Sequence, residues 1–300
     1  MKDSITLDGA VRLYLAKEHR SSIVTLFDIG AIVWNLYYVK RYDGKPISRI
    51  TASKPRKKTV FKCVDKLLQE GVIEHQSFLE KDMFVFIHHR SVEELICSID
   101  PFCYLSHISA MQYHGLTNIL PKILYATTYE HRAWNEKARS YMESQLQEDA
   151  SEYFELGFPQ LIRRHPNKIG DKNLSFIQSR QYGSYIVHPD TRVRVTSVGR
   201  TFLDALKRPE LCGGMSHVLD MFEEHGTTHV KLIVSEVDRH GSAVDKMRAG
   251  YILEEICHVK GNDIIQSWVQ FAQRGGSRKL DPHEAYWNTY SEKWMISINA

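Results

Sequence analysis

A basic amphipathic segment between Ser53 and Gln76 constrains the fold of this chain more than any other stretch. Its apolar residues recur at the three- and four-residue spacings that place side chains on one face of an α-helix: Val60, Val64, Leu67 and Leu68. Lysines at four-residue steps lie about 200° away around the helix axis and are expected to face solvent: Lys58, Lys62 and Lys66. The pattern predicts a helix from Lys54 to Glu70.

Both ends of this helix carry sequence signals. Ser53 is expected to cap the N-terminus, and Pro55 suits the first turn. Gly71 stands where a left-handed residue commonly ends a helix. The helix is therefore expected to be short and well delimited.

The charge of this region is strongly positive. Ten lysines and arginines fall between Lys40 and Lys66, against two acidic residues, Asp43 and Asp65. The whole chain carries a formal net charge of only +3, so the excess is local. An ordinary solvated helix also carries lysines, but a local excess of this size favours nucleic-acid phosphate as the counter-charge.

Segments on either side of the basic helix complete a winged helix-turn-helix pattern. Upstream, Leu7 to Arg20 and Leu26 to Val39 have helical patterns. Downstream, Val72–His75 and Met83–Ile87 are two short β-like runs that can pair as a hairpin. We therefore expect residues 1–95 to form a winged-helix DNA-binding domain.

In that domain the basic helix would enter the major groove. Residues in and before its first turn are expected near base edges: Lys54, Arg56, Lys57 and Thr59. Lysines on the exposed face are expected at phosphates: Lys58, Lys62 and Lys66. Arg56 is the candidate for a guanine contact, because its guanidinium matches two acceptors on that base.

The rest of the composition is that of an ordinary globular protein. A chain of 300 residues with 43% hydrophobic and 25% charged content is large enough for two domains. The N-terminus is too charged for a signal peptide, and no apolar run is long enough to cross a bilayer, so we expect a cytoplasmic protein. Five cysteines are scattered without a C-x-x-C pair, which favours reduced, buried thiols.

A second domain is expected over residues 96–300, which makes the chain α+β with a mixed α/β C-terminal part. Strand-like runs are expected to dominate its middle: Ile123–Thr128, Leu174–Ile177, Tyr185–Val187 and Val193–Thr196. A helix then follows a cap at Thr196 or Ser197, and its inward-facing residues are Phe202, Leu203, Ala205 and Leu206.

Short motifs follow one another in this second domain. They are YLSHISAMQYHGLT from Tyr104, S-x-x-R-T-x-L-D from Ser197, K-x-R-x-G-Y-x-L-E from Lys246, L-D-P from Leu280 and K-W-x-x-x-x-N from Lys293. Their order and spacing resemble the AbiEi family of antitoxins from type IV toxin–antitoxin (abortive infection) systems. The resemblance covers about residues 101–299.

This resemblance implies a function for the whole chain. A member of that family acts as an antitoxin without catalytic activity or cofactor, and represses its own promoter through the N-terminal domain. Its functional partner is a nucleotidyltransferase-like toxin, and neutralisation does not depend on a stable complex between the two. The resemblance therefore leaves open whether this protein forms a physical complex with the toxin and whether it binds DNA as a homodimer.

Two constellations invite a catalytic or metal-binding interpretation. His107 and His114 are seven residues apart, but no carboxylate or cysteine stands at a supporting ligand spacing, so no metal is expected. Within the family motif, His107, Ser109 and His114 are expected to hold a turn by hydrogen bonds. Arg200 and Asp204 are four residues apart and are expected to form an ion pair on one helical turn.

Two functions from other classes remain as alternatives. One is a stand-alone winged-helix transcription factor whose second domain senses a ligand. The other is a metal-dependent nuclease, for which Asp238, the Glu254-Glu255 pair and Lys260 would have to meet.

Overall fold

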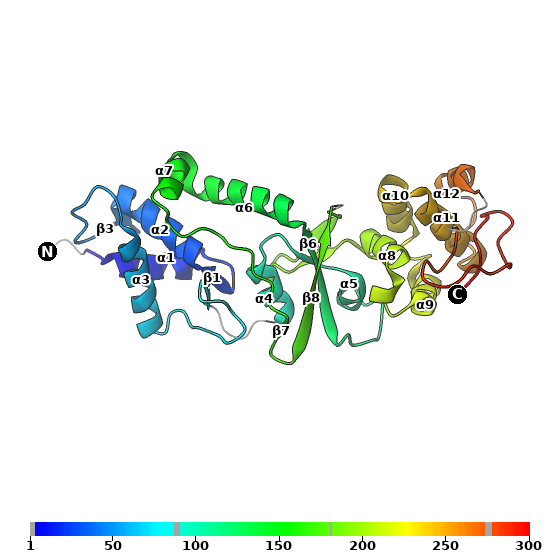
Figure 1. Ribbon diagram of the computed structural model, residues 1–300, viewed down its shortest axis with the longest axis horizontal. Coiled ribbons are helices and arrows are strands. Elements are labelled where there is room, and N and C mark those ends of the chain that lie inside the picture. The colour runs from blue at the N-terminus through cyan, green and yellow to red at the C-terminus, as the bar shows by residue number, and fades with distance from the viewer. Residues whose placement is uncertain (1–3, 87–90, 181, 274–277) are drawn as a thin grey trace. The chain divides into compact units, whose positions relative to one another are not determined.

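The computed structural model describes residues 4–86, 91–180, 182–273 and 278–300 (Figure 1). The chain is mixed α/β and divides into two compact units. Unit 1 comprises Met1–Cys103, Thr128–Lys172 and Gln178–Arg180. Unit 2 comprises Tyr104–Thr127, Asn173–Ile177 and Gln181–Ala300. The expected division at residue 95 concerns functional domains and stays a prediction.

Unit 1 begins with helices and short strands in alternation. Its first elements are α1 (Leu7–Glu18), β1 (Ile23–Thr25), α2 (Leu26–Val39), β2 (Arg41–Tyr42), β3 (Lys45–Pro46), α3 (Lys57–Gln69), β4 (Met83–Val85) and α4 (Val92–Ile99). The start of α2 is fixed by a reciprocal cap, in which Thr25 accepts from the amide of Asp28 and the Asp28 carboxylate accepts from the amide of Thr25. The helix predicted over Leu26 to Val39 is confirmed.

Strand β4 is paired on both of its edges. On one edge it runs antiparallel to β1, with Val24 opposite Phe84. On the other, Glu74 and Val85 exchange two backbone hydrogen bonds of 2.9 Å. The hairpin predicted from Val72–His75 and Met83–Ile87 is thus reduced to one residue pair, because turns occupy most of the chain between Gln76 and Met83. Ile87 lies outside the described residues.

The core of unit 1 reaches beyond these first elements. It includes side chains from α6 (His131–Leu146), α7 (Ala150–Glu155) and the segment after it. The ring of Tyr153 meets Trp34 edge-on at 5.3 Å, and Phe158 meets the same indole at 5.0 Å. A Cβ at Gly30 would collide with the Tyr153 hydroxyl, so α2 needs glycine at this contact.

The expectation that strands dominate the middle of the chain is wrong for residues 131–155. Helix α6 buries Trp134, Ala138, Met142 and Leu146, which recur every four residues along one face. The 3₁₀ turn η1 (Gln147–Asp149) joins α6 to α7. These helices contribute to the unit 1 core rather than to a sheet.

The largest sheet has the strand order β7-β8-β6-β5-β10-β9. Its strands are β5 (Tyr104–Leu105), β6 (Ile123–Tyr129), β7 (Lys168–Ile169), β8 (Lys172–Ser179), β9 (Tyr185–Val187) and β10 (Arg194–Thr196). Within unit 2, β5 pairs antiparallel with β6 and parallel with β10, and β10 pairs antiparallel with β9. Three of the four strand-like runs of the sequence therefore lie wholly in strands, and the fourth, Val193–Thr196, contains β10 from Arg194 on.

Helices form most of the rest of unit 2, and the described residues 278–300 are non-helical with isolated β-bridges. The helices are α5 (His107–Tyr113), α8 (Val198–Lys207), η2 (Pro209–Leu211), α9 (Met215–His225), α10 (Val230–His240), α11 (Ala243–Tyr251), the π turn η3 (Ile252–Ile256), α12 (Asp263–Ser267) and η4 (Trp268–Phe271). The predicted inward face of α8 is fully buried in the core of this unit. Trp294 is also buried, with its ring against Gly250 of α11.

Among the described residues, no helix combines the length and apolarity needed to span a membrane. The described chain also contains no disulfide, and four of the five cysteines are buried. Burial raises the pKa of the Cys63 thiol to about 12 and that of Cys257 to about 11. The raised pKa values keep both thiols protonated at neutral pH.

Candidate functional site

The basic helix α3 begins three residues later than the sequence pattern predicts. Proline disfavours helical geometry in the residue before it, so Lys54 cannot belong to a helix that passes through Pro55. Arg56 has an extended backbone with φ of −107° and ψ of 151°, and α3 starts at Lys57. The prediction that Ser53 caps the helix is therefore wrong. Gly71 has φ of +66°, as expected for the residue that ends it.

The two faces of α3 differ as the spacing predicts. Its buried residues are Val60, Cys63, Val64 and Leu67, which pack on α1 and α2. The lysines of the opposite face are exposed: Lys58, Lys62 and Lys66. Thr59 is half-buried in the first turn. A charged stripe thus runs along the solvent side of the helix.

Two of the predicted DNA-binding lysines already have carboxylate partners within unit 1. Lys66 pairs with Asp8 of α1, and Lys54 pairs with Glu152 of α7. In the part of the chain that the structure describes, no ion pair engages the other four cations, Arg56, Lys57, Lys58 and Lys62. These four cations, all exposed, form what we call the α3 basic surface.

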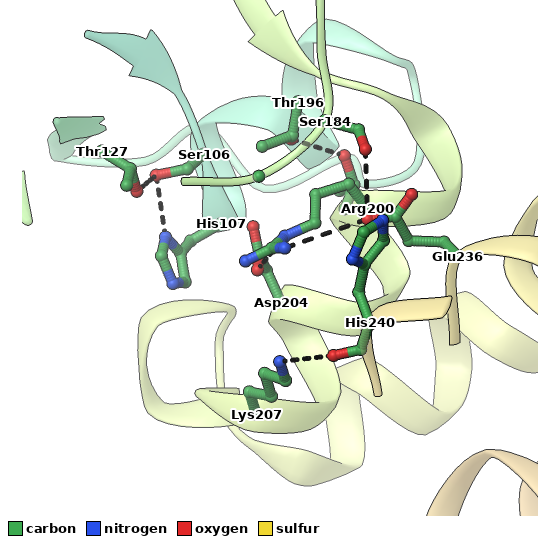
Figure 2. A network of polar contacts seen from close by, with 12 residues as sticks. Ser106, His107, Thr127, Ser184, Thr196, Arg200, Asp204, Lys207, Glu236 and His240 are labelled. Carbon is green, nitrogen blue, oxygen red and sulfur yellow. Dashed lines mark hydrogen bonds and ion pairs between the residues drawn. The ribbon is translucent and has the colours of Figure 1, made fainter. Parts of the chain in front are cut away.

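A second group of predicted residues lies in unit 2, where α5 follows β5 (Figure 2). The Ser106 hydroxyl accepts a hydrogen bond from Thr127 at 2.8 Å and lies 2.9 Å from Nδ1 of His107. Both residues are buried, and His107 has a positive φ of 54°. Burial, assisted by the charges of Arg208 and Arg200, lowers the pKa of His107 to about 3. The ring is neutral at physiological pH and too weakly basic to activate a hydroxyl.

The other two residues of this motif connect α5 to neighbouring strands. Ser109 accepts from the amide of Tyr125 in β6 at 2.8 Å. His114 Nε2 donates to the carbonyl of Thr196 in β10 at 2.6 Å. The hydrogen bonds expected of His107, Ser109 and His114 are thus present, and all three bonds are internal to unit 2.

The predicted ion pair between Arg200 and Asp204 is confirmed and is buried. Arg200 Nε lies 2.7 Å from the Asp204 carboxylate, and Nη1 lies 3.9 Å from Glu236 of α10 (Figure 2). Burial raises the pKa of Asp204 to about 6, although Arg200 opposes the shift. Gly183 permits the close approach of the guanidinium, because a Cβ there would stand 2.7 Å from Arg200 Cζ.

Glu236 is a member of this cluster that sequence reasoning missed. It lies on α10 between the buried residues Val234 and Val237, and accepts a hydrogen bond from Ser184 at 3.4 Å. A single acidic residue within a buried helical stripe is the signal that identifies such a position. Arg200, the cation near Glu236, is however 36 positions away along the chain, so no local sequence spacing links the two residues.

The carboxylates considered for a nuclease each bind different neighbours. Asp238 accepts from the indole of Trp268 and pairs with Lys246. Glu254 pairs with Lys293, and Glu255 accepts from Ser291. Across the described ranges, no three His, Cys, Asp or Glu side chains are grouped to hold a metal ion.

The last two motifs of the second domain meet in space. Asn299 Oδ1 accepts from the amide of Asp281, and Nδ2 donates to the carbonyls of Asp281 and Ala285 at 2.9 and 3.0 Å. The amide of Leu280 also donates to the carbonyl of Ser297. The L-D-P and K-W-x-x-x-x-N segments are therefore held together by hydrogen bonds.

Comparison with known proteins gives little further information. No family model matches the chain, and no curated protein matches it. Among solved structures, the chain is similar to the crystal structure of the RV2827C protein from Mycobacterium tuberculosis, with a TM-score of 0.47 and 11% sequence identity. The match covers 99% of this chain and 92% of the other. A likeness at this level carries no argument about function.

Proposed function

We propose that this chain is a DNA-binding antitoxin of the AbiEi type, which represses its own promoter and counteracts a nucleotidyltransferase-like toxin in the cytoplasm. The observation that carries the DNA-binding part is the α3 basic surface, a cluster of exposed cations on a helix whose other face is packed into the unit 1 core. Such a helix offers positive charge at fixed positions, which is what a duplex requires.

The order of elements in unit 1 supports a winged helix. Helix α1, strand β1, helices α2 and α3 and strand β4 follow one another, and β4 pairs with both β1 and Glu74. In this interpretation α3 is the recognition helix. The loop from His75 to Asp82, which we call the wing loop, is the wing.

The ion pairs of unit 1 refine the expected contacts. Arg56 and Lys57 stand at the start of α3, where a recognition helix approaches base edges, and Lys58 and Lys62 are available to phosphates. Lys54 and Lys66 would have to leave Glu152 and Asp8 to contact DNA. We therefore assign the main DNA contacts to the α3 basic surface and expect Lys54 and Lys66 to contribute less to DNA binding.

Unit 2 is proposed to carry the antitoxin activity. Its motif residues form hydrogen bonds or ion pairs with other residues of unit 2 and so stabilise its fold, which suits a non-enzymatic role. They are His107, Ser109, His114, Arg200 and Asp204. The toxin is a functional partner, whereas a physical complex and a homodimer on DNA remain proposals. The nuclease alternative is not favoured, because its carboxylates bind separate partners.

A gel-shift experiment tests the proposal. The full-length protein is titrated onto its own upstream DNA and onto a scrambled duplex at several salt concentrations. We expect preferential, salt-sensitive binding that Arg56→Ala with Lys58→Ala abolishes. A matched control, Arg132→Ala with Lys122→Ala, removes two exposed positive charges elsewhere and should bind normally. Equal failure of the unmodified protein on both duplexes would contradict DNA binding.

A further inference from the structure

Unit 1 contains a cavity of about 520 Å³ that the proposed DNA contacts do not use. One wall is the stretch Ser77–Lys81 of the wing loop, and another is the segment Arg163–Pro166 that follows α7. Cavities of roughly 300–1,000 Å³ are the size that binds small molecules in proteins. The space is therefore large enough for a small organic ligand.

Positive charge predominates on the lining of this cavity. Arg163, Arg164 and Lys81 contribute three cations, and Glu80 contributes one carboxylate. Arg164 is neutralised by Asp82, which lies 3.2 Å away. Glu80 offsets one further cation, so one net positive charge, supplied by Arg163 and Lys81, is left to attract an anion.

Arg163 is the residue that identifies the ligand class. Its Nε lies 3.4 Å from Nε2 of His165, a ring nitrogen that also contacts the Asp100 carboxylate at 2.9 Å. Its Nη2 has no hydrogen-bond partner among the residues that the structure describes, but a water-sized molecule cannot reach that atom, so a ligand would meet the rest of this half-buried side chain. A guanidinium fork matches the oxygens of a carboxylate or of a phosphate.

Another part of the lining is apolar. Phe78 and Leu79 of the wing loop are half-buried and supply the accessible apolar surface, because Met83 and Ile99 are each only 1% exposed. An inorganic ion would leave this surface uncovered, whereas an anion with an apolar body would cover it. A DNA backbone phosphate offers the same charge, but it brings a sugar rather than an apolar group.

We propose that this cavity binds a small organic anion, a carboxylate or phosphate ester with an apolar body, through Arg163 with Lys81 at its rim. Binding places a negative charge against the wing loop and neutralises Lys81 there. Because DNA binding depends on positive charge, the bound anion lowers the affinity for DNA. This regulatory consequence rests on the proposed DNA-binding function, whereas the binding site itself does not.

Calorimetric titration of the full-length protein tests the site. The probes are phenyl phosphate, inorganic phosphate and phenol at constant ionic strength. We expect saturable one-site binding of phenyl phosphate, at least tenfold weaker binding of inorganic phosphate, and none of phenol. Arg163→Ala should weaken phenyl phosphate binding at least tenfold, and Lys81→Ala about threefold. Arg132→Ala, which removes an exposed arginine of α6, is the matched control and should bind as the unmodified protein does.

The variants distinguish an anion site in the cavity from a solvent-filled space and from a DNA contact. If Arg163→Ala fails to fold, Lys81→Ala still decides, because that side chain is exposed and its loss does not disturb the core. Unchanged affinity in Lys81→Ala and Arg163→Ala, or no saturable binding, overturns the site and leaves the cavity to solvent. If Arg163→Ala reduces the salt dependence of DNA binding without affecting phenyl phosphate, the arginine belongs to the DNA interface instead.

A gel shift with phenyl phosphate tests the regulatory part separately. We expect it to weaken the DNA complex of the unmodified protein and to leave that of Arg163→Ala unchanged, with inorganic phosphate at equal ionic strength as the control. Binding of phenyl phosphate by a protein that never binds DNA would retain the site and contradict the proposed function. DNA binding without phenyl phosphate binding would contradict the anion site and retain the proposed function.

Discussion

Single residues of unit 2 carry charge and polarity where solvent is absent. Arg200 and Asp204 are each less than a tenth exposed, and Asp204 remains close to the guanidinium at 2.7 Å. His107 is equally buried and stays neutral, chiefly because burial lowers the pKa of its ring and secondarily because its neighbours Arg208 and Arg200 are positive. Arg200, which stabilises the buried Asp204 carboxylate, therefore also opposes protonation of the nearby histidine.

His107 should make the stability of the protein depend on pH. Its pKa is about 3 in the folded state and 6.5 ordinarily, so the unfolded chain binds the proton first. The contribution of His107 is fully present above about pH 6.5 and is lost as the pH falls, by up to about 1.4 kcal/mol per pH unit. Asparagine tolerates the positive φ, so His107→Asn should remove this dependence.

The measurement is the free energy of unfolding by urea for both proteins between pH 7 and pH 4. Asp204 has the opposite sign, because its folded pKa of about 6 exceeds the ordinary value of 3.8 and its contribution grows as the pH falls. The difference between the two proteins isolates His107, and His131→Asn on the exposed surface of α6 is the control. A pH-independent difference would show that His107 titrates alike in both states.

The sequence predicts the Arg200–Asp204 pair because the two residues are one helical turn apart. It could not predict Glu236 as the third member, since only the packing of α10 on α8 brings that carboxylate near Arg200. The same limit applies to Arg163, whose importance depends on a cavity formed with a loop about 80 residues earlier. Local sequence spacing identifies residue pairs within one helix or strand, whereas a cluster built from several elements can be identified only once the fold is known.

At the scale of elements, helix α3 shows what periodicity determines and what it leaves open. Its buried and exposed faces follow from the apolar and lysine spacings. Its start does not: Pro55 disfavours helical geometry at Lys54 and Arg56 is extended, so the helix begins at Lys57 and Ser53 does not cap it. Helix α6 shows the converse case: its four-residue apolar spacing is clear in the sequence, yet strands are expected for this part of the chain.

Substitution of the α3 lysines should separate DNA contacts from ion pairs. Lys58→Ala and Lys62→Ala should each reduce the slope of log affinity against log salt by about 0.9, with little change in stability. Lys66→Ala should change the slope less and lower the stability only slightly, because an exposed lysine loses its pair with Asp8. Fluorescence anisotropy titrations between about 50 and 200 mM salt measure the slopes, and urea unfolding measures stability.

Two results would contradict this assignment. Equal slope changes for Lys66→Ala and Lys58→Ala would mean that Lys66 leaves Asp8 to contact DNA. Unfolding of unit 1 by Lys58→Ala or Lys62→Ala would mean that these side chains do not lie on the solvent face.

At the scale of the whole molecule, unit 1 is not a contiguous stretch of chain. Trp34 of α2 is fully buried, and its indole contacts Tyr153 and Phe158 and donates to Asp149 at 3.3 Å. All three partners lie far beyond residue 95 in the sequence. The helices that would bind DNA therefore complete their core with residues that come after the first strands of the sheet.

A fragment of residues 1–95 should consequently be unstable. It retains Trp34 as its single tryptophan and lacks the aromatic rings that cover it. We expect its fluorescence to be shifted to longer wavelength and its urea midpoint to lie well below that of residues 1–180, which contain all of unit 1. Each exposed core side chain costs about 1.5–3 kcal/mol. A fragment 1–95 with a buried indole and cooperative unfolding would support the division at residue 95.

The burial of Trp294 and Ile296 has a consequence for how the chain is made. The ribosome delivers the core of unit 1 complete once Leu161 has emerged, whereas the core of unit 2 waits for Ile296. At about 5–20 residues per second, the intervening stretch of about 135 residues takes roughly 7–27 s to synthesise. During that interval the nascent chain contains a complete unit 1 core and an incomplete unit 2 core. Under the proposed function, each new molecule would be able to bind its operator before it could act against the toxin.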